Sequence, residues 1–258
     1  MNNQVVKYEK LDAVSIIRMD RPEAMNSLNA QLRCELRAAI ETAGSDASVR
    51  AIVLTGTGRC FCAGADLKTK TTDLDVEQTL QTEYRPIFEA IAEMRQPVIC
   101  AINGSAAGIG LSLALACDLL IMAQDAFMLS PFTNISLVPD GGLSWYLVHQ
   151  LGYRRAFQLS IESERISAER CVQLGLANRT VSAETLMEET LKWAIRLAER
   201  APLSMAATKK TMRFSATNDW AHTFDIEASE QKTLRASADH AAGVAAFLEK
   251  RNTKFEGR

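Results

Sequence analysis

The chain has little histidine and lacks the short motifs that mark metalloprotease, nucleotide or serine-hydrolase chemistry. Its three histidines, His149, His222 and His240, lie far apart on segments with helical patterning, which favours surface or packing roles. The sequence contains no H-E-x-x-H, no G-x-S-x-G and no G-x-x-x-x-G-K-[ST]. It therefore gives no support to a catalytic zinc, a nucleophile elbow or a phosphate-cradling P-loop, and we expect no resident metal.

Cysteine is present but not in a metal-binding arrangement. Of the six cysteines, only Cys60 and Cys62 are close in sequence, and no second pair or histidine lies near them to complete a zinc site. The six thiols fall in apolar or packed segments. We therefore expect all of them to be buried and free.

No block of one charge and no long apolar run is found. The formal net charge is −2 over 258 residues, with acids and bases interleaved, which argues against a nucleic-acid footprint. No apolar stretch approaches 18 residues, and residues 1–9 are too polar for a targeting signal. With 47% hydrophobic residues, the composition fits a cytoplasmic enzyme with a sizeable core and no contact with membranes or nucleic acid.

Strand and helix signals alternate in the first part of the chain, and helix signals dominate the rest. Strands are expected at residues 14–19, 51–55, 97–102, 118–123 and 177–181. Helices are expected from Asn29 to Gly44, at 76–95 with a kink or break at Pro86, and at 111–117, 142–150, 153–161, 167–174, 184–199, 203–216 and 219–236. This order predicts an α/β core with parallel strands at 1–200 and a helical C-terminal region at 201–258.

Three segments place small residues where a backbone must approach something closely. They are F-C-A-G-A-D-L at 61–67, A-I-N-G-S-A-A-G-I-G at 101–110 and L-V-P-D-G-G at 137–142. In the second, a strand leads through glycines into a helix, so free N–H groups and the helix dipole favour an anion there. The order G-x-x-x-G-x-G does not fit a dinucleotide fingerprint. Glycines that serve only tight turns and close helix packing remain the alternative.

Taken together, these segments resemble the crotonase (enoyl-CoA hydratase/isomerase) superfamily over nearly the whole chain. The matching landmarks are R-P at 21–22, M-N-S-L at 25–28, A-I-V-L-T-G at 51–56, and the segments 61–68, 97–104, 108–118, 175–177 and 246–251. The resemblance implies a spiral of repeated β-β-α turns, followed by a helical region that builds trimers and often hexamers. It also implies an acyl-CoA substrate whose coenzyme A is part of the substrate, with no separate cofactor.

The resemblance also implies positions for the site. Two backbone N–H groups, at Ala65 and Ile109, would form an oxyanion hole for the thioester carbonyl, each worth about 3–4 kcal/mol against developing negative charge. Asp66 and Asp118 match positions that are structural in the family, as caps or turn anchors. Coenzyme A would lie against Ala24 and the segment Ala63, Gly64 and Asp66, and its phosphates would be reached by Lys68 and, from a neighbouring subunit or through the C-terminal tail, by Lys250.

The sequence departs from the hydratase pattern at the proton-transfer positions. Hydratases of the family carry two glutamates where this chain has Ser112 and Phe132, and neither residue transfers protons unaided. Asp140 matches the place where isomerase-type members carry an aspartate. Burial among Phe132, Leu137, Val138 and Trp145 is expected to raise its pKa and suit it to shuttling a proton. An enoyl-CoA isomerase-like enzyme is therefore predicted, in fatty-acid or aromatic breakdown, with Phe132 in the substrate pocket.

Other interpretations of the same residues stay open. Asp140 stands between proline and two glycines, so its side chain is also suited to capping the next helix. In some relatives the corresponding aspartate attacks an aryl substrate. The same oxyanion hole would serve a CoA thioester hydrolase, a hydratase-like enzyme, or a member that binds acyl-CoA without turnover.

Overall fold

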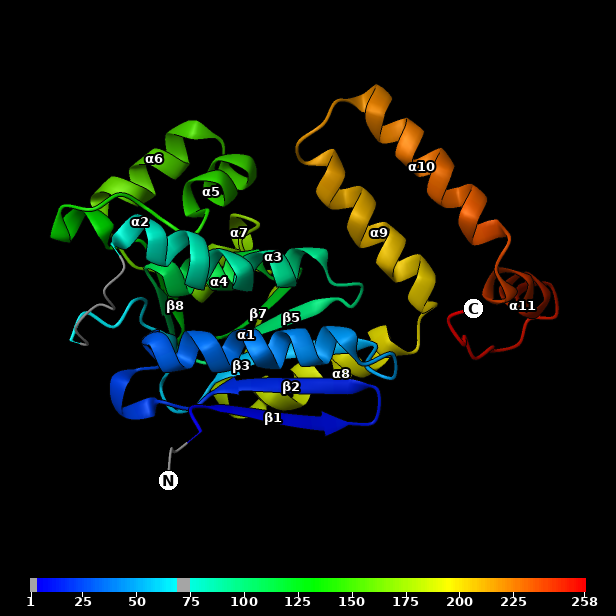
Figure 1. The fold of residues 1–258 in the computed structure, drawn as a ribbon, viewed down its shortest axis with the longest axis horizontal. Coiled ribbons are helices and arrows are strands. Elements are labelled where there is room, and N and C mark those ends of the chain that lie inside the picture. The colour runs from blue at the N-terminus through cyan, green and yellow to red at the C-terminus, as the bar shows by residue number, and fades with distance from the viewer. Residues whose placement is uncertain (1–3, 69–74) are drawn as a thin grey trace.

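A six-stranded sheet forms the centre of the core (Figure 1). The computed structural model describes residues 4–68 and 75–258 of the chain. The strand order of the sheet is β1-β2-β3-β5-β7-β10, with every neighbouring pair parallel except the β1–β2 hairpin. The strands are β1 Val6–Leu11, β2 Val14–Met19, β3 Ala51–Gly56, β5 Val98–Ile102, β7 Leu119–Ala123 and β10 Arg179–Val181. The five expected strands are confirmed. β1 was not predicted, because it is an edge strand whose residues after Val6 are exposed and lack an apolar pattern.

A second, four-stranded sheet is made of segments without a strand signal in the sequence. Its order is β4-β6-β8-β9, with β4 Cys60–Cys62, β6 Ser105–Ala107, β8 Phe127–Leu129 and β9 Ile166–Ser167. In the chain, β3 is followed by β4, β5 by β6 and β7 by β8, and a helix follows each of these pairs. The chain thus repeats a β-β-α turn, which is the spiral that the resemblance predicted.

The helices of the core follow the expected order. They are α1 Ala30–Ser45, α2 Val76–Thr79, α3 Arg85–Glu93, α4 Ile109–Ala116, α5 Leu143–Leu151, α6 Tyr153–Glu162, α7 Ala168–Gln173 and α8 Leu186–Ala198. Asn29 caps α1 by accepting a hydrogen bond from the Leu32 N–H at 2.9 Å. The irregularity expected at Pro86 is confirmed as a π-helical turn, Leu80–Tyr84, between α2 and α3.

The prediction that all six thiols are buried is wrong for one of them. Cys60, Cys62, Cys100, Cys117 and Cys171 are buried, but Cys34 is exposed. Cys34 lies on α1 midway between Leu32 and Leu36, which both face the core, so its side chain points from the opposite side of the helix.

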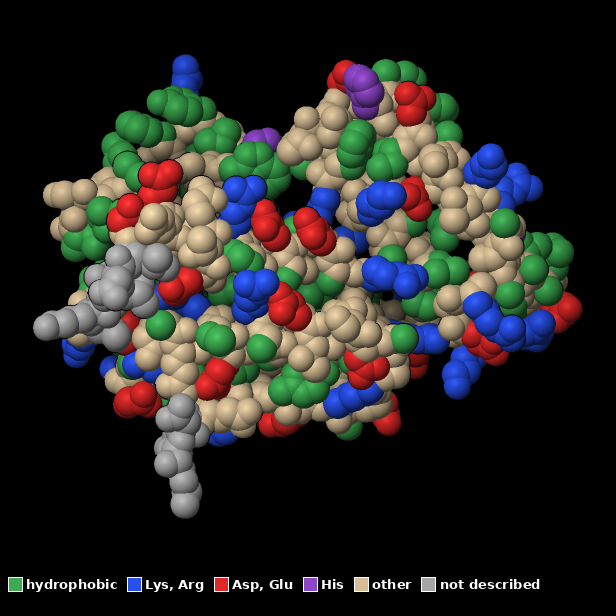
Figure 2. Space-filling view, viewed as in Figure 1, with side chains coloured by type: hydrophobic (Ala, Val, Ile, Leu, Met, Phe, Trp, Pro, Cys, Tyr) green, Lys and Arg blue, Asp and Glu red, His purple; other side chains and the backbone are tan. Residues whose placement is uncertain are grey.

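Three C-terminal helices form an arm that reaches away from the core (Figure 1). They are α9 Pro202–Ser215, α10 Trp220–Arg235 and α11 Ala238–Leu248, of which α11 was not predicted. A cleft of about 530 Å³ separates α9 and α10 from the end of α3, and Figure 2 shows it as a gap between core and arm. Within the described residues, no helix combines the length and apolar character needed to cross a membrane.

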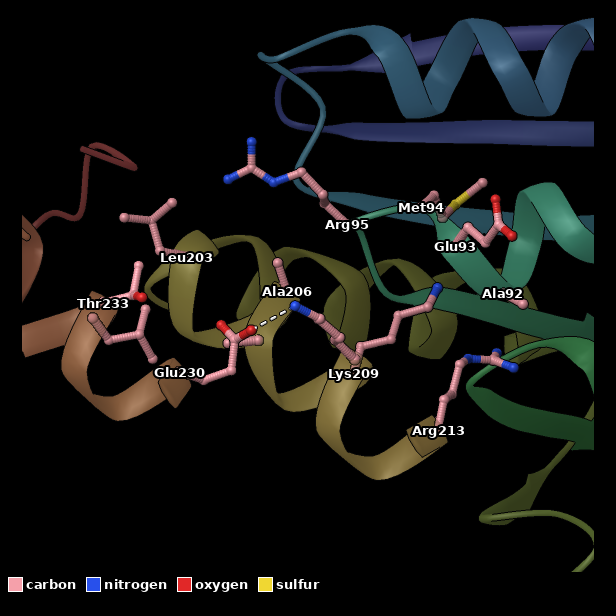
Figure 3. Close-up of a pocket in the computed structure, with 13 residues that line it drawn as sticks. Ala92, Glu93, Met94, Arg95, Leu203, Ala206, Lys209, Arg213, Glu230 and Thr233 are labelled. Carbon is pink, nitrogen blue, oxygen red and sulfur yellow. Dashed lines mark hydrogen bonds and ion pairs between the residues drawn. The ribbon is translucent and has the colours of Figure 1, made fainter. Parts of the chain in front are cut away.

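Asp118 fastens the arm to the core. Its carboxylate accepts a hydrogen bond from the Val98 N–H at 2.8 Å and forms ion pairs of 2.7 Å with Lys209 and Arg213 of α9. Figure 3 shows both basic side chains extending from α9 toward the core. The Lys209 ammonium also donates to the carbonyl oxygens of Ile91 and Gln96, so its three donors are all used. Burial lowers the pKa of Lys209, although the neighbouring Asp118 carboxylate acts in the opposite direction.

We expect Asp118→Ala to lower the free energy of unfolding by about 3–5 kcal/mol, because it leaves two basic groups without their counter-charge in a largely buried setting. Urea denaturation measures the loss. Glu188→Ala is the control: its ion pair with Lys192 at 2.7 Å lies in solvent on one helix face, and its loss should cost less than about 1 kcal/mol. Equal losses in the two variants would show that Asp118 does not fasten the arm.

Candidate active site

The Ala65 N–H is directed away from Leu28, the residue with which Ala65 forms a β-bridge. Leu28 and Ala65 form a parallel bridge in which the Leu28 N–H donates to the Gly64 oxygen at 2.8 Å and the Leu28 oxygen accepts from the Asp66 N–H at 3.3 Å. In such a ladder the residue between two bonded groups turns its own N–H to the other side. Among residues 4–68 and 75–258, no acceptor for the Ala65 N–H is found.

The Ile109 N–H is the first of helix α4. Within that helix the Gly108 oxygen accepts from the N–H groups of Leu111 and Ser112, and no acceptor for the Ile109 N–H is found in the described part of the chain. The first N–H groups of a helix have no intrahelical partner and add the positive end of the helix dipole. All eight residues of α4 are buried, so this end is not free to move.

Two glycines bring these two donors together. Gly64 and Gly108 directly precede Ala65 and Ile109 and have φ values of +101° and +57°, a region that favours glycine. A Cβ on Gly64 would lie 3.0 Å from the Ala107 oxygen and 3.6 Å from Gly108 Cα. The two turns are therefore in contact, and each ends in an N–H without a partner in the described chain. Such a pair is suited to binding an oxygen that gains negative charge.

Asp140 lies against the first turn of α4. A Cβ on the adjacent Gly141 would lie 2.8 Å from Ile109 Cγ1 and 2.9 Å from Ser112 Cβ. The backbone oxygen of Asp140 accepts from the Ser112 hydroxyl at 2.8 Å and from the Leu143 N–H at 3.0 Å. The loop that carries the acid is therefore fastened both to α4 and to the start of α5.

The Asp140 side chain is half-buried, and one of its two carboxyl oxygens is shielded from solvent. Its Oδ1 has no hydrogen-bond partner within the described residues. Burial raises its pKa from 3.8 to about 6, because the charged form loses solvation. A carboxyl with this pKa exchanges a proton readily near neutral pH.

Two expectations for Asp140 are corrected. The cap of α5 is Gly142, and no side chain caps that helix, so the capping interpretation of Asp140 is wrong. Leu137, Val138 and Trp145 do not enclose the acid, since they are 52%, 77% and 41% exposed. The contacts of Gly141 with α4 and with Phe88 enclose this loop instead.

Ser112 and Phe132, which the resemblance aligned with the two hydratase glutamates, both lie beside the donor turns or the Asp140 loop. Ser112 is fully buried and its hydroxyl donates to the Asp140 backbone, so it holds the acid's loop. Phe132 is buried, and its ring tip lies 4.0 Å from the position of a Cβ on Gly108. Phe132 thus forms an apolar wall beside the donor turns, and its place in a substrate pocket stays a prediction.

The expected coenzyme A contacts fall in two places. The Ala63 N–H donates to the Met25 oxygen at 3.0 Å, which sets the turn containing Ala24 beside the segment Ala63–Lys68. Lys68 is exposed at the end of that segment. Lys250 follows α11, and Figure 1 places α11 on the far side of the molecule from α2 and β8. Within one chain, Lys250 is therefore not brought to the site.

The sequence analysis missed a group of polar residues behind the Ala65 segment. Arg33 of α1 and Tyr84 of the π-helical turn both donate to the Leu28 carbonyl, and Glu83 of the same turn accepts from Arg33. One signal was available: an arginine beside Leu32 on the otherwise apolar face of α1. Neither these residues nor any others in the described ranges form a cluster of three or more metal-binding side chains.

We expect Asp140→Asn to stabilise the fold at neutral pH. The folded-state pKa of about 6 lies above the ordinary 3.8, so the native state holds the proton more tightly and stability falls as pH rises through that window. At about pH 7.5 the variant, which cannot ionise, should be more stable by about 2 kcal/mol, and at about pH 4 the difference should vanish. Urea unfolding at both pH values measures this, and a variant of equal stability at both would show that the carboxylate carries no burial cost.

Known proteins align with this chain over its whole length. The sequence profile described as enoyl-CoA hydratase/isomerase matches residues 9–258. A probable enoyl-CoA hydratase of Rhodobacter capsulatus is 41% identical, with 100% of both chains covered. The 1,2-epoxyphenylacetyl-CoA isomerase of Escherichia coli is 34% identical, with 95% of each chain covered.

Solved structures agree with the sequence relatives. The crystal structure of an enoyl-CoA hydratase from Bacillus anthracis superposes with a TM-score of 0.94 at 30% identity, covering 99% of this chain and 100% of that one. Profile, relatives and fold all support one conclusion: this chain is an enzyme of the enoyl-CoA hydratase/isomerase family, in the crotonase superfamily.

Proposed function

We propose that the enzyme shifts the double bond of an acyl-CoA from the 3 to the 2 position, with Asp140 as the proton carrier. The observation that carries this proposal is the half-buried Asp140 carboxyl on a loop packed against the start of α4. The carboxyl has a pKa of about 6, and its Oδ1 is shielded from solvent and has no partner in the described chain. Ser112 and Phe132 at the two hydratase positions support a mechanism with a single acid–base group.

The reaction needs one base and one oxyanion hole. The thioester oxygen accepts hydrogen bonds from the N–H groups of Ala65 and Ile109, and ionised Asp140 removes a proton from C2 of the 3-enoyl chain. The resulting dienolate places its negative charge on the thioester oxygen, where the two donors and the α4 dipole stabilise it. Asp140 then returns the proton to C4, which leaves the double bond between C2 and C3.

The acyl group that fits this site is apolar near its reacting carbons. Phe132 stands beside the donor turns, and Phe88 reaches the Asp140 loop. Aromatic walls of this kind suit either an alkenyl chain or a ring-derived acyl group. The name of the E. coli relative, 1,2-epoxyphenylacetyl-CoA isomerase, supports the ring-derived class.

Water addition to a 2-enoyl-CoA is the second candidate. The name of the Rhodobacter relative, probable enoyl-CoA hydratase, favours it. In this site Asp140 alone would have to activate the water and protonate C2, because Ser112 is occupied with the Asp140 backbone and Phe132 carries no proton. That demand makes hydration the weaker of the two.

We also propose that the C-terminal arm packs against further copies of this chain. Its helices carry large apolar side chains in solvent, among them Met212, Trp220 and Phe224 of α9 and α10 and Phe247 of α11. Exposed apolar surface of this kind is typical of an interface between subunits. In such an assembly Lys250 reaches the coenzyme A of a neighbouring subunit.

We expect Asp140→Asn to lower the rate of 3-enoyl-CoA isomerisation by about 10²-fold or more, because the amide cannot carry the proton. The assay follows the increase in ultraviolet absorbance as the double bond becomes conjugated with the thioester. Asp125→Asn is the control, since Asp125 is an exposed acid in the turn between β7 and β8. Full activity in Asp140→Asn would remove Asp140 from the mechanism, whereas wild-type consumption of 2-enoyl-CoA alone, with falling absorbance, would establish hydration instead.

The pH dependence tests the state of the acid. Asp140 must be ionised in the free enzyme to accept a proton, so kcat/KM of the wild type should rise with pH through a midpoint of about 6 and then level off. Initial rates at low substrate concentration measure this profile. A midpoint near the ordinary aspartate value would contradict the role of burial.

A further inference from the structure

The carbonyl oxygen of Leu28 accepts three hydrogen bonds. The donors are the Asp66 N–H at 3.3 Å, the Arg33 guanidinium at 3.0 Å and the Tyr84 hydroxyl at 3.3 Å. Leu28 is also the residue whose N–H and C=O bond to both sides of Ala65. The Leu28 N–H holds the Gly64–Ala65 peptide, which carries the Ala65 N–H, and the Leu28 carbonyl holds the following Ala65–Asp66 peptide. Groups that fix Leu28 therefore fix the backbone on both sides of Ala65.

Arg33 is buried although it is charged. The residue is 9% exposed, and its guanidinium lies over the Tyr84 ring at 4.7 Å and donates to the Glu83 carboxylate at 2.8 Å and to the Tyr84 hydroxyl at 3.3 Å. Tyr84 is itself 5% exposed, and burial raises its pKa to about 12, so it stays a hydrogen-bond donor. These contacts together fix the geometry of the group.

The fold alone does not require this group. The neighbouring buried positions of α1 are Leu32, Leu36 and Ile40, and an apolar side chain at position 33 would extend the same face. Buried ion pairs replaced by apolar residues of similar volume are often neutral or stabilising. The presence of Arg33 is better explained by its bond to the Leu28 carbonyl, because Leu28 in turn holds the backbone around Ala65.

The segment that supplies Glu83 and Tyr84 also touches the other half of the site. Both residues belong to the π-helical turn Leu80–Tyr84, and turns of this kind occur frequently at functional sites. One turn later, in α3, the Phe88 ring lies 3.0 Å from the position of a Cβ on Gly141, beside the catalytic acid proposed above. A single helical segment therefore supports both the Ala65 donor and the Asp140 loop.

We propose that Arg33, Glu83 and Tyr84 are positioning residues that hold the Ala65 N–H in line with the thioester oxygen. They act on the substrate only through Leu28 and the Gly64–Asp66 backbone, and the inference rests on the function proposed for Ala65. Loss of this support leaves the donor present but badly aimed. Small errors in aim are costly, because the hydrogen bond must be strongest when the oxygen carries most charge.

The test compares Tyr84→Phe and the double variant Arg33→Gln/Glu83→Gln, which removes the buried ion pair as a unit. Arg37→Gln is the matched control, since Arg37 lies one turn further along α1 and its 2.7 Å pair with Glu41 is in solvent. We expect kcat to fall about 10-fold in the double variant and several-fold in Tyr84→Phe, with KM changed less than about twofold. Arg37→Gln should match the wild type.

A spectroscopic measurement distinguishes a change in the orientation of the Ala65 N–H from a general loss of structure. The infrared stretching frequency of the thioester carbonyl, in a bound unreactive acyl-CoA, falls in proportion to the hydrogen bonding of its oxygen. The wild type and Arg37→Gln should lower this frequency strongly, and the two test variants should lower it less. Tyr84→Phe removes one hydroxyl without changing side-chain shape, so it decides the question even if the double variant fails to fold.

The outcomes are distinct. If the wild type lowers the carbonyl frequency and Tyr84→Phe lowers it equally, with unchanged kcat, the positioning inference is overturned and the proposed function stands. If the wild type binds the acyl-CoA without lowering the frequency, the oxyanion hole itself is absent and the proposed function fails. A rise in KM alone in the test variants would also overturn the inference, because it would place these residues in substrate binding.

Discussion

Two backbone N–H groups that the described protein leaves unpaired are the constraint around which the rest of the site is arranged. Buried backbone donors such as the Ile109 N–H are nearly always hydrogen-bonded, whereas Ala65 is exposed. To leave both N–H groups available for a substrate, the chain must keep protein acceptors away from them. Gly64 and Gly108 do this by adopting positive φ values directly before Ala65 and Ile109. Their turns pack against each other, with a Cβ on Gly108 placed 3.7 Å from Gly64 Cα.

Helix α4 connects this site to the C-terminal arm. Its first residue, Ile109, is a candidate donor, while at its other end the Ala116 oxygen accepts a hydrogen bond of 2.8 Å from Arg213 of α9. Asp118, two residues beyond Ala116, pairs with the same arginine and with Lys209. A short buried helix held at its far end has little freedom to shift along its axis. The charge cluster beneath the arm therefore contributes to the placement of the Ile109 N–H.

The sequence predicted the long elements and the close backbone approaches, and it missed what has no periodic signal. The strands with continuous apolar runs, such as β3 and β5, were recognisable because parallel strands are buried on both faces. The strands β4, β6 and β8 contain three residues each, too few to show alternation, so only the family resemblance implied them. Arg33 was missed because its meaning depends on Leu28 and Glu83, which meet it only in the folded chain.

The absence of a described partner on Asp140 Oδ1 fits the one-acid mechanism proposed above. A carboxyl that takes a proton from C2 and returns it to C4 must reach two carbons, so a protein hydrogen bond that fixed its orientation would hinder one of the two transfers. A donor from the protein would also stabilise the charged form and lower the pKa. The structure instead holds the Asp140 backbone through the Ser112 hydroxyl and leaves Oδ1 without a described partner. Ser112 therefore fixes the main chain of Asp140 without adding charge. A glutamate at position 112 would bring a second negative charge close to the Asp140 carboxylate and repel it.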